Sequence, residues 1–188
     1  MTATQLGLSP SHHSTEPVGR IDTADHSWRD EGGGSEVAER CLTFLSNIEI
    51  TTQPLGRNDA QLLDGLAIVE GRLLVDTNTP VWPGDLLHEA GHIAVAAPEH
   101  RANLGPIEAD GGDEMAAIAW SYAASLQCDL SLEHLFHNGG YRGDSAILRE
   151  AFANGSYLGA PMLGFFGMCD PHGHEQDCPF PAMTRWLR

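Results

Sequence analysis

The sequence predicts an α+β fold built as one domain. Residues 66–76, LAIVEGRLLVD, carry two short apolar runs around Glu70-Gly71, which is the pattern of a β-hairpin. Elsewhere, apolar residues recur at the spacing of a helix face. The segments with this spacing are 35–48, 84–97, 113–126 and 145–155. A chain of 188 residues, 41% of them hydrophobic, is long enough to bury one core around these elements.

Residues 1–35 are predicted to form a flexible N-terminal arm. They are polar, rich in Ser, Thr, His and Gly, and end in EGGGSE. Such a composition buries too little apolar surface to offset the entropy of ordering the chain. The single folded domain is therefore predicted to span residues 36–188, and His12 and His13 are interpreted as solvated side chains of the arm.

The first predicted helix begins at Ser35, whose hydroxyl is expected to cap it. Val37, Cys41, Leu42 and Leu45 share one face of this helix at the spacing of a buried stripe.

Later helix ends are marked by Pro, Asp and Gly. Pro80 and Pro83 precede the helix at 84–97, Asp144 is placed to cap the last helix, and Gly155 is placed to end it.

Composition excludes several classes of function. The formal charge of −16 repels phosphates, so neither nucleic acid nor an anionic membrane is expected as a partner. All ten basic residues are arginines, which excludes lysine Schiff-base chemistry and a lysine-dependent phosphate loop. The N-terminus lacks the basic start and apolar middle of a secretory signal, so we expect a cytoplasmic protein with reduced cysteines.

The segment DLLHEAGHIAV, residues 85–95, places two histidines four positions apart with a glutamate between them. On a helix, His88, His92, Asp85 and Glu89 fall within about 100° of one another, and the apolar residues occupy the opposite side. Two imidazoles one turn apart can share one metal ion, while Glu89 stands beside it as a base for water. Gly91 lets another backbone approach this wall.

Glu114 is the candidate third ligand. It stands 22 residues after His92, at the start of a helix that is apolar nearly all round. A carboxylate at the edge of a buried helix needs a partner to offset its desolvation, and a metal ion would supply one. Alternatively, Asp113 and Glu114 simply occupy a first helical turn, where acidic residues suit the helix dipole.

The segment His88-Glu89-Ala90-Gly91-His92 resembles the active-site helix of the zincin metallopeptidases. With Glu114 on a later helix, residues 81–122 resemble the gluzincin branch, including the small intracellular ImmA/IrrE-type members. The resemblance implies a zincin-like helical layer beside a small sheet. It implies that His88, His92 and Glu114 hold one Zn²⁺ and that Glu89 is the general base.

The loop LFHNGGYRGD offers further candidates for the site. His137 and Tyr141 are candidate donors to a developing oxyanion, and Arg142 is a candidate partner for a substrate carboxylate. Asp85 is the candidate carboxylate that orients a metal-binding histidine.

The string CDPHGHEQDC offers four side chains of the types that bind zinc. They are Cys169, His172, His174 and Cys178. Two interpretations stay open, a second structural metal site and a loop packed over the first site. The final PAMTRWLR is expected to dock Met183, Trp186 and Leu187 onto the body.

Three functions are compatible with these residues. The first is a zinc metallopeptidase acting on a peptide or protein substrate. The second is a non-hydrolytic enzyme in which two histidines and a carboxylate hold Fe²⁺, but this leaves Glu89 without a role. The third is a catalytically silent regulatory protein with a structural metal or none. The sequence indicates no oligomeric state.

Overall fold

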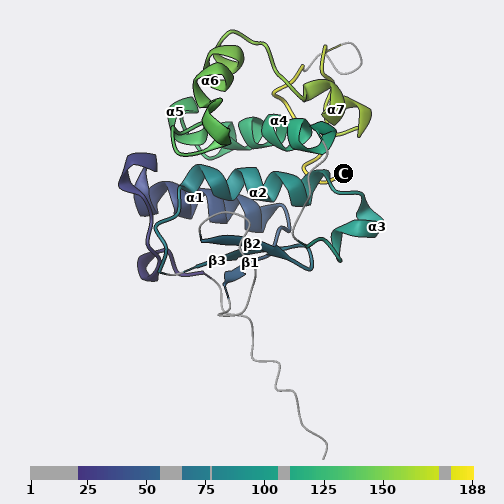
Figure 1. Ribbon diagram of the computed structural model, residues 1–188. Coiled ribbons are helices and arrows are strands. Elements are labelled where there is room, and N and C mark those ends of the chain that lie inside the picture. Colours follow the sequence, from purple (N-terminus) through teal and green to yellow (C-terminus); the bar gives the residue numbers. More distant parts are fainter. Residues whose placement is uncertain (1–20, 56–64, 77, 106–110, 174–178) are drawn as a thin grey trace, which may run out of the picture.

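The computed structural model describes residues 21–55, 65–76, 78–105, 111–173 and 179–188, and they form an α+β fold as predicted. Figure 1 shows three layers, with the sheet at the bottom, α1 and α2 in the middle, and α4 with its neighbours on top. The strands are β1 (Thr52–Pro54), β2 (Leu66–Val69) and β3 (Arg72–Val75). The α-helices are α1 (Gly34–Asn47), α2 (Pro83–Val95), α3 (Pro98–Arg101), α4 (Gly111–Gln127), α5 (Leu132–Leu135), α6 (Ser145–Ala153) and α7 (Ala160–Phe165). Short 3₁₀ turns are η1 (Thr23–Asp25), η2 (Asp30–Gly32) and η3 (Tyr141–Gly143).

The predicted hairpin is confirmed. β2 and β3 pair antiparallel in the register Leu66↔Val75, and Glu70 and Gly71 turn between them with φ values of 50° and 70°. Both angles are left-handed, as a tight two-residue hairpin turn requires. β1 pairs parallel to β3 and completes the order β1-β3-β2. β1 was not predicted because a three-residue strand has no readable alternation.

The predicted buried face of α1 is also confirmed, since Val37, Cys41, Leu42 and Leu45 all lie in the core. The cap is different from the prediction. Gly33, not Ser35, precedes the helix, with a φ of 96° that favours glycine.

The described part of the predicted arm, residues 21–35, packs on the body. Ile21 is buried, Trp28 forms a bridge with Val81, and the Arg29 amide donates to the Val81 carbonyl at 2.9 Å. Composition alone did not indicate these contacts, because they depend on a partner more than 50 positions away. Residues 1–20, including His12 and His13, lie outside the described residues.

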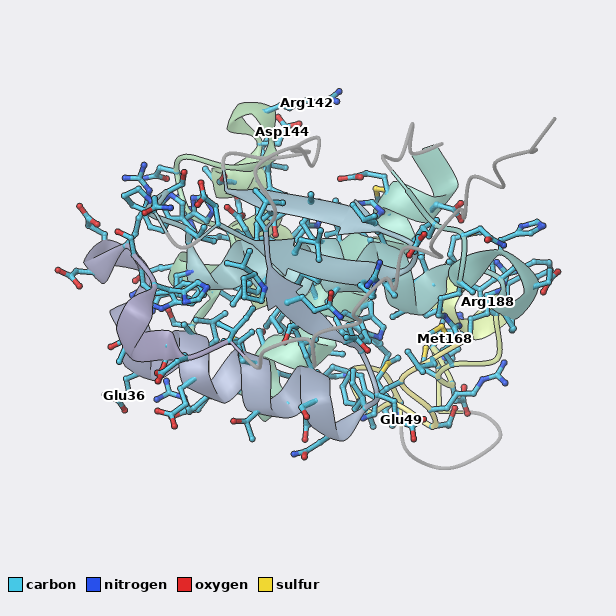
Figure 2. The ribbon with its side chains drawn as sticks, turned by 90° about the horizontal axis from the view of Figure 1, so that it is seen from below. Glu36, Glu49, Arg142, Asp144, Met168 and Arg188 are labelled. Atoms are coloured by element: carbon cyan, nitrogen blue, oxygen red, sulfur yellow. The ribbon has the colours of Figure 1, made fainter. Side chains whose placement is uncertain are left out.

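The C-terminal segment docks as predicted, with Met183, Trp186 and Leu187 packed against the core. Trp120 donates its indole N–H to the Trp186 carbonyl at 2.9 Å. The chain end lies near Met168 at the right side of Figure 2, whereas Arg142 and Asp144 lie at its upper edge. None of the described helices combines the length and apolarity needed to cross a bilayer.

The middle and top layers meet where α2 packs against α4, and Gly91 lies at this contact. A Cβ on Gly91 would come within 2.9 Å of the Ala117 carbonyl oxygen and 3.2 Å of the Ala117 Cα. The predicted close approach of another backbone to Gly91 is therefore confirmed. It brings the first turn of α4 beside the two histidines of α2.

Gly91→Ala is expected to lower the free energy of unfolding by about 1–3 kcal/mol, because the added methyl group pushes α4 away from α2. Chemical denaturation measures this change. Gly105→Ala is the matched control, since a Cβ at Gly105 meets nothing within 4 Å. Equal stability of the two variants would contradict the close packing.

Candidate metal centre

Helix α2 presents its histidines toward α4 because its other faces are core. Leu86, Leu87, Ala90, Ile93 and Ala94 are all buried in the core cluster. The remaining face carries the polar side chains of the HEAGH segment, and it is covered by α4 and by the loop after α5.

The structure brings together the three side chains predicted to be ligands. His88 Nε2 lies 3.5 Å from Glu114 Oε1, and His92 Nε2 lies 3.3 Å from Glu114 Oε2. Both distances exceed the usual 2.9 Å of an N–H···O hydrogen bond. Ligands about 2.1 Å from a tetrahedral metal lie about 3.4 Å from one another, and these two distances are close to that value.

Glu89 lies at the same cluster. One ligand atom from each of His88, Glu89 and His92 falls within 4.8 Å of the others, so this His/Glu/His group could bind a metal ion. Two carboxylates therefore approach the histidines. Glu114 divides its two oxygens between the two imidazoles at 3.5 and 3.3 Å.

Burial sets the charge states of the cluster in the metal-free protein. Desolvation lowers the pKa of His88 to about 4, aided by His92, so the imidazole is neutral and can donate a lone pair. Desolvation raises the pKa of Glu89 to about 7. The hydrogen-bonding contact with His92 lowers the pKa of Glu114, which keeps that carboxylate ionised.

Tyr141 lies over the histidines. Its ring meets the His88 ring edge-on with centroids 5.2 Å apart. Its hydroxyl is buried and makes no hydrogen bond of normal geometry among the described residues, although the Ser121 side chain lies close enough to interact with it. Burial raises the pKa of Tyr141 well above its usual value, so the hydroxyl keeps its proton and remains a donor.

His137 is placed differently from the expectation of a free donor. Its Nε2 lies 2.8 Å from Asp85 Oδ1, and its Nδ1 accepts the Gly139 amide proton at 3.2 Å. The ring also stacks on Trp82 with centroids 4.0 Å apart. Because both nitrogens are engaged, His137 fixes the loop and has no proton to offer to a substrate.

The Asp85–His137 pair also corrects the predicted role of Asp85. Asp85 does not hold either candidate ligand histidine, and the Nδ1 of His88 is buried without a partner among the described residues. No local pattern indicates this pair or the stacking on Trp82, because 52 positions separate Asp85 from His137.

The cap predicted at Asp144 is replaced by another interaction. Asp144 precedes α6, but its side chain makes no capping hydrogen bond. Ser145 is the buried anchor here, and its hydroxyl donates to the His137 carbonyl at 2.7 Å.

The C-terminal Cys/His string is described only as far as Gly173. Cys169 is buried with its Sγ 3.8 Å from the Ala160 carbonyl oxygen, and burial raises the pKa of this thiol to about 11. His172 is exposed. His174 and Cys178 lie outside the described residues, so the second metal site stays a prediction.

Comparison with protein-family models, curated proteins and solved structures gives no match. The functional argument therefore depends on the side chains of the cluster and on their geometry.

In the metal-free protein, Glu89→Gln is expected to raise stability at pH 8 but not at pH 4.5. The glutamate ionises at 4.5 in the reference state and at about 7 in the fold, so its burial begins to destabilise the protein as pH rises above 4.5. The full effect, up to about 3 kcal/mol, is reached above the folded pKa.

Thermal unfolding across this pH range measures the difference between wild type and variant. Glu99→Gln, at an exposed position, controls for the loss of one charge. A difference that does not vary with pH would contradict the burial of an ionisable Glu89.

Proposed function

We propose that this protein is a zinc-dependent hydrolase that cleaves a peptide or amide bond. The observation that carries the proposal is the division of the two Glu114 oxygens between His88 Nε2 and His92 Nε2. The Glu89 carboxyl group at the same cluster is the second support. This combination resembles a zincin site in residue types and in spacing.

Zinc is favoured over iron by the position of Glu89. Two histidines and a carboxylate suit either ion. A buried carboxyl group beside the histidines has a role in hydrolysis, as a base for water, and has none in the oxygenase alternative. When bound at His88, His92 and Glu114, zinc would supply Lewis acidity to the substrate carbonyl and lower the pKa of water.

Glu89 is proposed to move the proton. Its carboxylate takes a proton from the attacking water and then gives it to the leaving nitrogen, so one group serves as base and as acid. A pKa of about 7 in the metal-free protein suits both directions of transfer. A bound cation would lower this value and favour the base form.

Tyr141 is proposed to stabilise the charge that develops on the carbonyl oxygen. Its hydroxyl is shielded from water and keeps its proton, and the Ser121 side chain is its hydrogen-bonding neighbour. A donor already in place strengthens its interaction as negative charge appears. His137 acts through the loop that it holds and has no direct contact with substrate in this proposal.

Elemental analysis of the purified protein is expected to find one equivalent of zinc. His88→Ala and Glu114→Ala are each expected to lose it, because each removes one of three ligands. His100→Ala is the matched control, since His100 is exposed on α3. Iron as the bound metal would favour the oxygenase, and full zinc in Glu114→Ala would remove Glu114 from the site.

On a mixed-peptide or casein substrate, Glu89→Gln is expected to lower kcat by about 10²–10⁴-fold while keeping zinc, because the proton transfer is lost.

Tyr141→Phe is expected to lower kcat by about 10²–10³-fold with little change in KM. Steady-state kinetics with zinc content checked in parallel measure both effects. Undiminished cleavage by zinc-loaded Glu89→Gln would reject Glu89 as the base.

A further inference from the structure

The turn that holds Tyr141 is strained in a way that local sequence does not demand. Tyr141 and Arg142 are consecutive non-glycine residues with left-handed φ values of 54° and 51°. Such a conformation is unfavourable for side chains larger than glycine, and it persists where the surrounding structure enforces it. Here the turn is held by the residues before it. His137 is bonded to Asp85 through its ring, and its carbonyl accepts a hydrogen bond from the Ser145 hydroxyl.

The strain places two side chains on opposite sides of the turn. The Tyr141 hydroxyl is directed inward and is buried near His88. Arg142 extends from the edge of the molecule into solvent (Figure 2). One backbone distortion therefore pairs an inward phenol with an outward cation.

Arg142 differs from the other described arginines in having no partner for its side chain. Those others contact carbonyl or side-chain oxygens or an aromatic ring; they are Arg29, Arg40, Arg72, Arg101, Arg149, Arg185 and Arg188. Among the described residues, no hydrogen bond, ion pair or ring contact involves the Arg142 guanidinium.

This cation follows directly after Tyr141, whose ring contacts His88 in the candidate metal centre. The side chains of His88 and His92 are 12% and 7% exposed, whereas that of Glu114 is 38% exposed. In a chain of net charge −16, an anionic group approaching here meets an arginine that has no partner among the described residues.

We propose that Arg142 is a specificity-determining residue that binds a carboxylate of the substrate beside the scissile bond. The proposal rests on the proposed hydrolase function, because it defines which peptides that site accepts. The planar guanidinium suits a carboxylate, which it can bind with two parallel hydrogen bonds. The carboxylate belongs either to the C-terminus of the peptide or to an acidic side chain.

The test uses dye-labelled short peptides that differ in one group. One ends in a free carboxylate, one is the same peptide with a C-terminal amide, and two further amidated peptides carry Glu or Gln at the last position. Fluorescence anisotropy with zinc-loaded Glu89→Gln measures binding without turnover. Wild-type kcat/KM on the same peptides measures specificity.

The carboxylate peptides are expected to bind about tenfold more tightly than their neutral partners, as one charge-assisted contact allows. Arg142→Asn, combined with Glu89→Gln for binding, is expected to abolish this preference. Asn tolerates the left-handed backbone, so the charge is removed without added strain. The free terminus and the Glu side chain are separate arms, and the preferred arm identifies the source of the carboxylate.

Arg72→Gln is the matched control, because it removes the same charge on β3, in the sheet layer away from α4. A preference that survives in Arg142→Asn, or that falls equally in Arg72→Gln, would overturn the proposal. Equal binding of charged and neutral peptides by the protein with Arg142 would overturn it as well.

The two proposals fail in different ways. Absence of zinc and of cleavage rejects the hydrolase, while anisotropy with the metal-free protein still reports whether Arg142 selects carboxylates. Zinc-dependent cleavage without carboxylate preference keeps the hydrolase and rejects the role of Arg142.

Discussion

The close contact between α2 and α4 is the constraint on which the candidate site depends. A Cβ on Gly91 would lie 2.9 Å from the Ala117 carbonyl oxygen, closer than van der Waals contact, so the two helices reach this separation only because residue 91 is glycine. At that separation one carboxylate, Glu114, reaches imidazoles on two successive turns of α2. A larger residue at 91 would move the Glu114 carboxylate away from both imidazole rings. The absence of a side chain at Gly91 therefore determines how close Glu114 comes to His88 and His92.

The same contact brings several carboxylate groups close together between α2 and α4. Asp85 and Glu114 both repel the Glu89 carboxylate, and this repulsion adds to the desolvation that raises the pKa of Glu89. His88 cannot balance them, because its own burial keeps it neutral. The apolar faces of α2 and α4 bury enough surface to hold this arrangement together. A divalent cation at Glu114 and the two imidazoles would convert the repulsion among the carboxylates into attraction.

The sequence predicted those features that are local or periodic. The HEAGH spacing on a helix, the hairpin turn at Glu70-Gly71 and the buried face of α1 are all read within about one turn of chain. Glu114 could be predicted as a candidate ligand because a carboxylate at the edge of an apolar helix needs a partner. The packing of residues 21–35, strand β1 and the Asp85–His137 pair were not predictable, since each depends on a partner that only the folded chain brings near. His137 illustrates the limit, because the residue type suits a proton donor, whereas the bonding of its two nitrogens to Asp85 and Gly139 could not be predicted.

The engagement of His137 explains how a strained turn can be held in a fixed position. Its ring is clamped between Asp85 and the Gly139 amide, stacked on Trp82, and its carbonyl is held by Ser145. These contacts tie the loop to the first turn of α2, the same helix that carries His88 and His92. Tyr141 therefore moves with the histidines and not independently of them. Because the Tyr141 hydroxyl is held in place relative to His88 and His92, it does not have to reorient when negative charge develops on the substrate. Such preorganisation is the physical requirement for electrostatic stabilisation of a transition state.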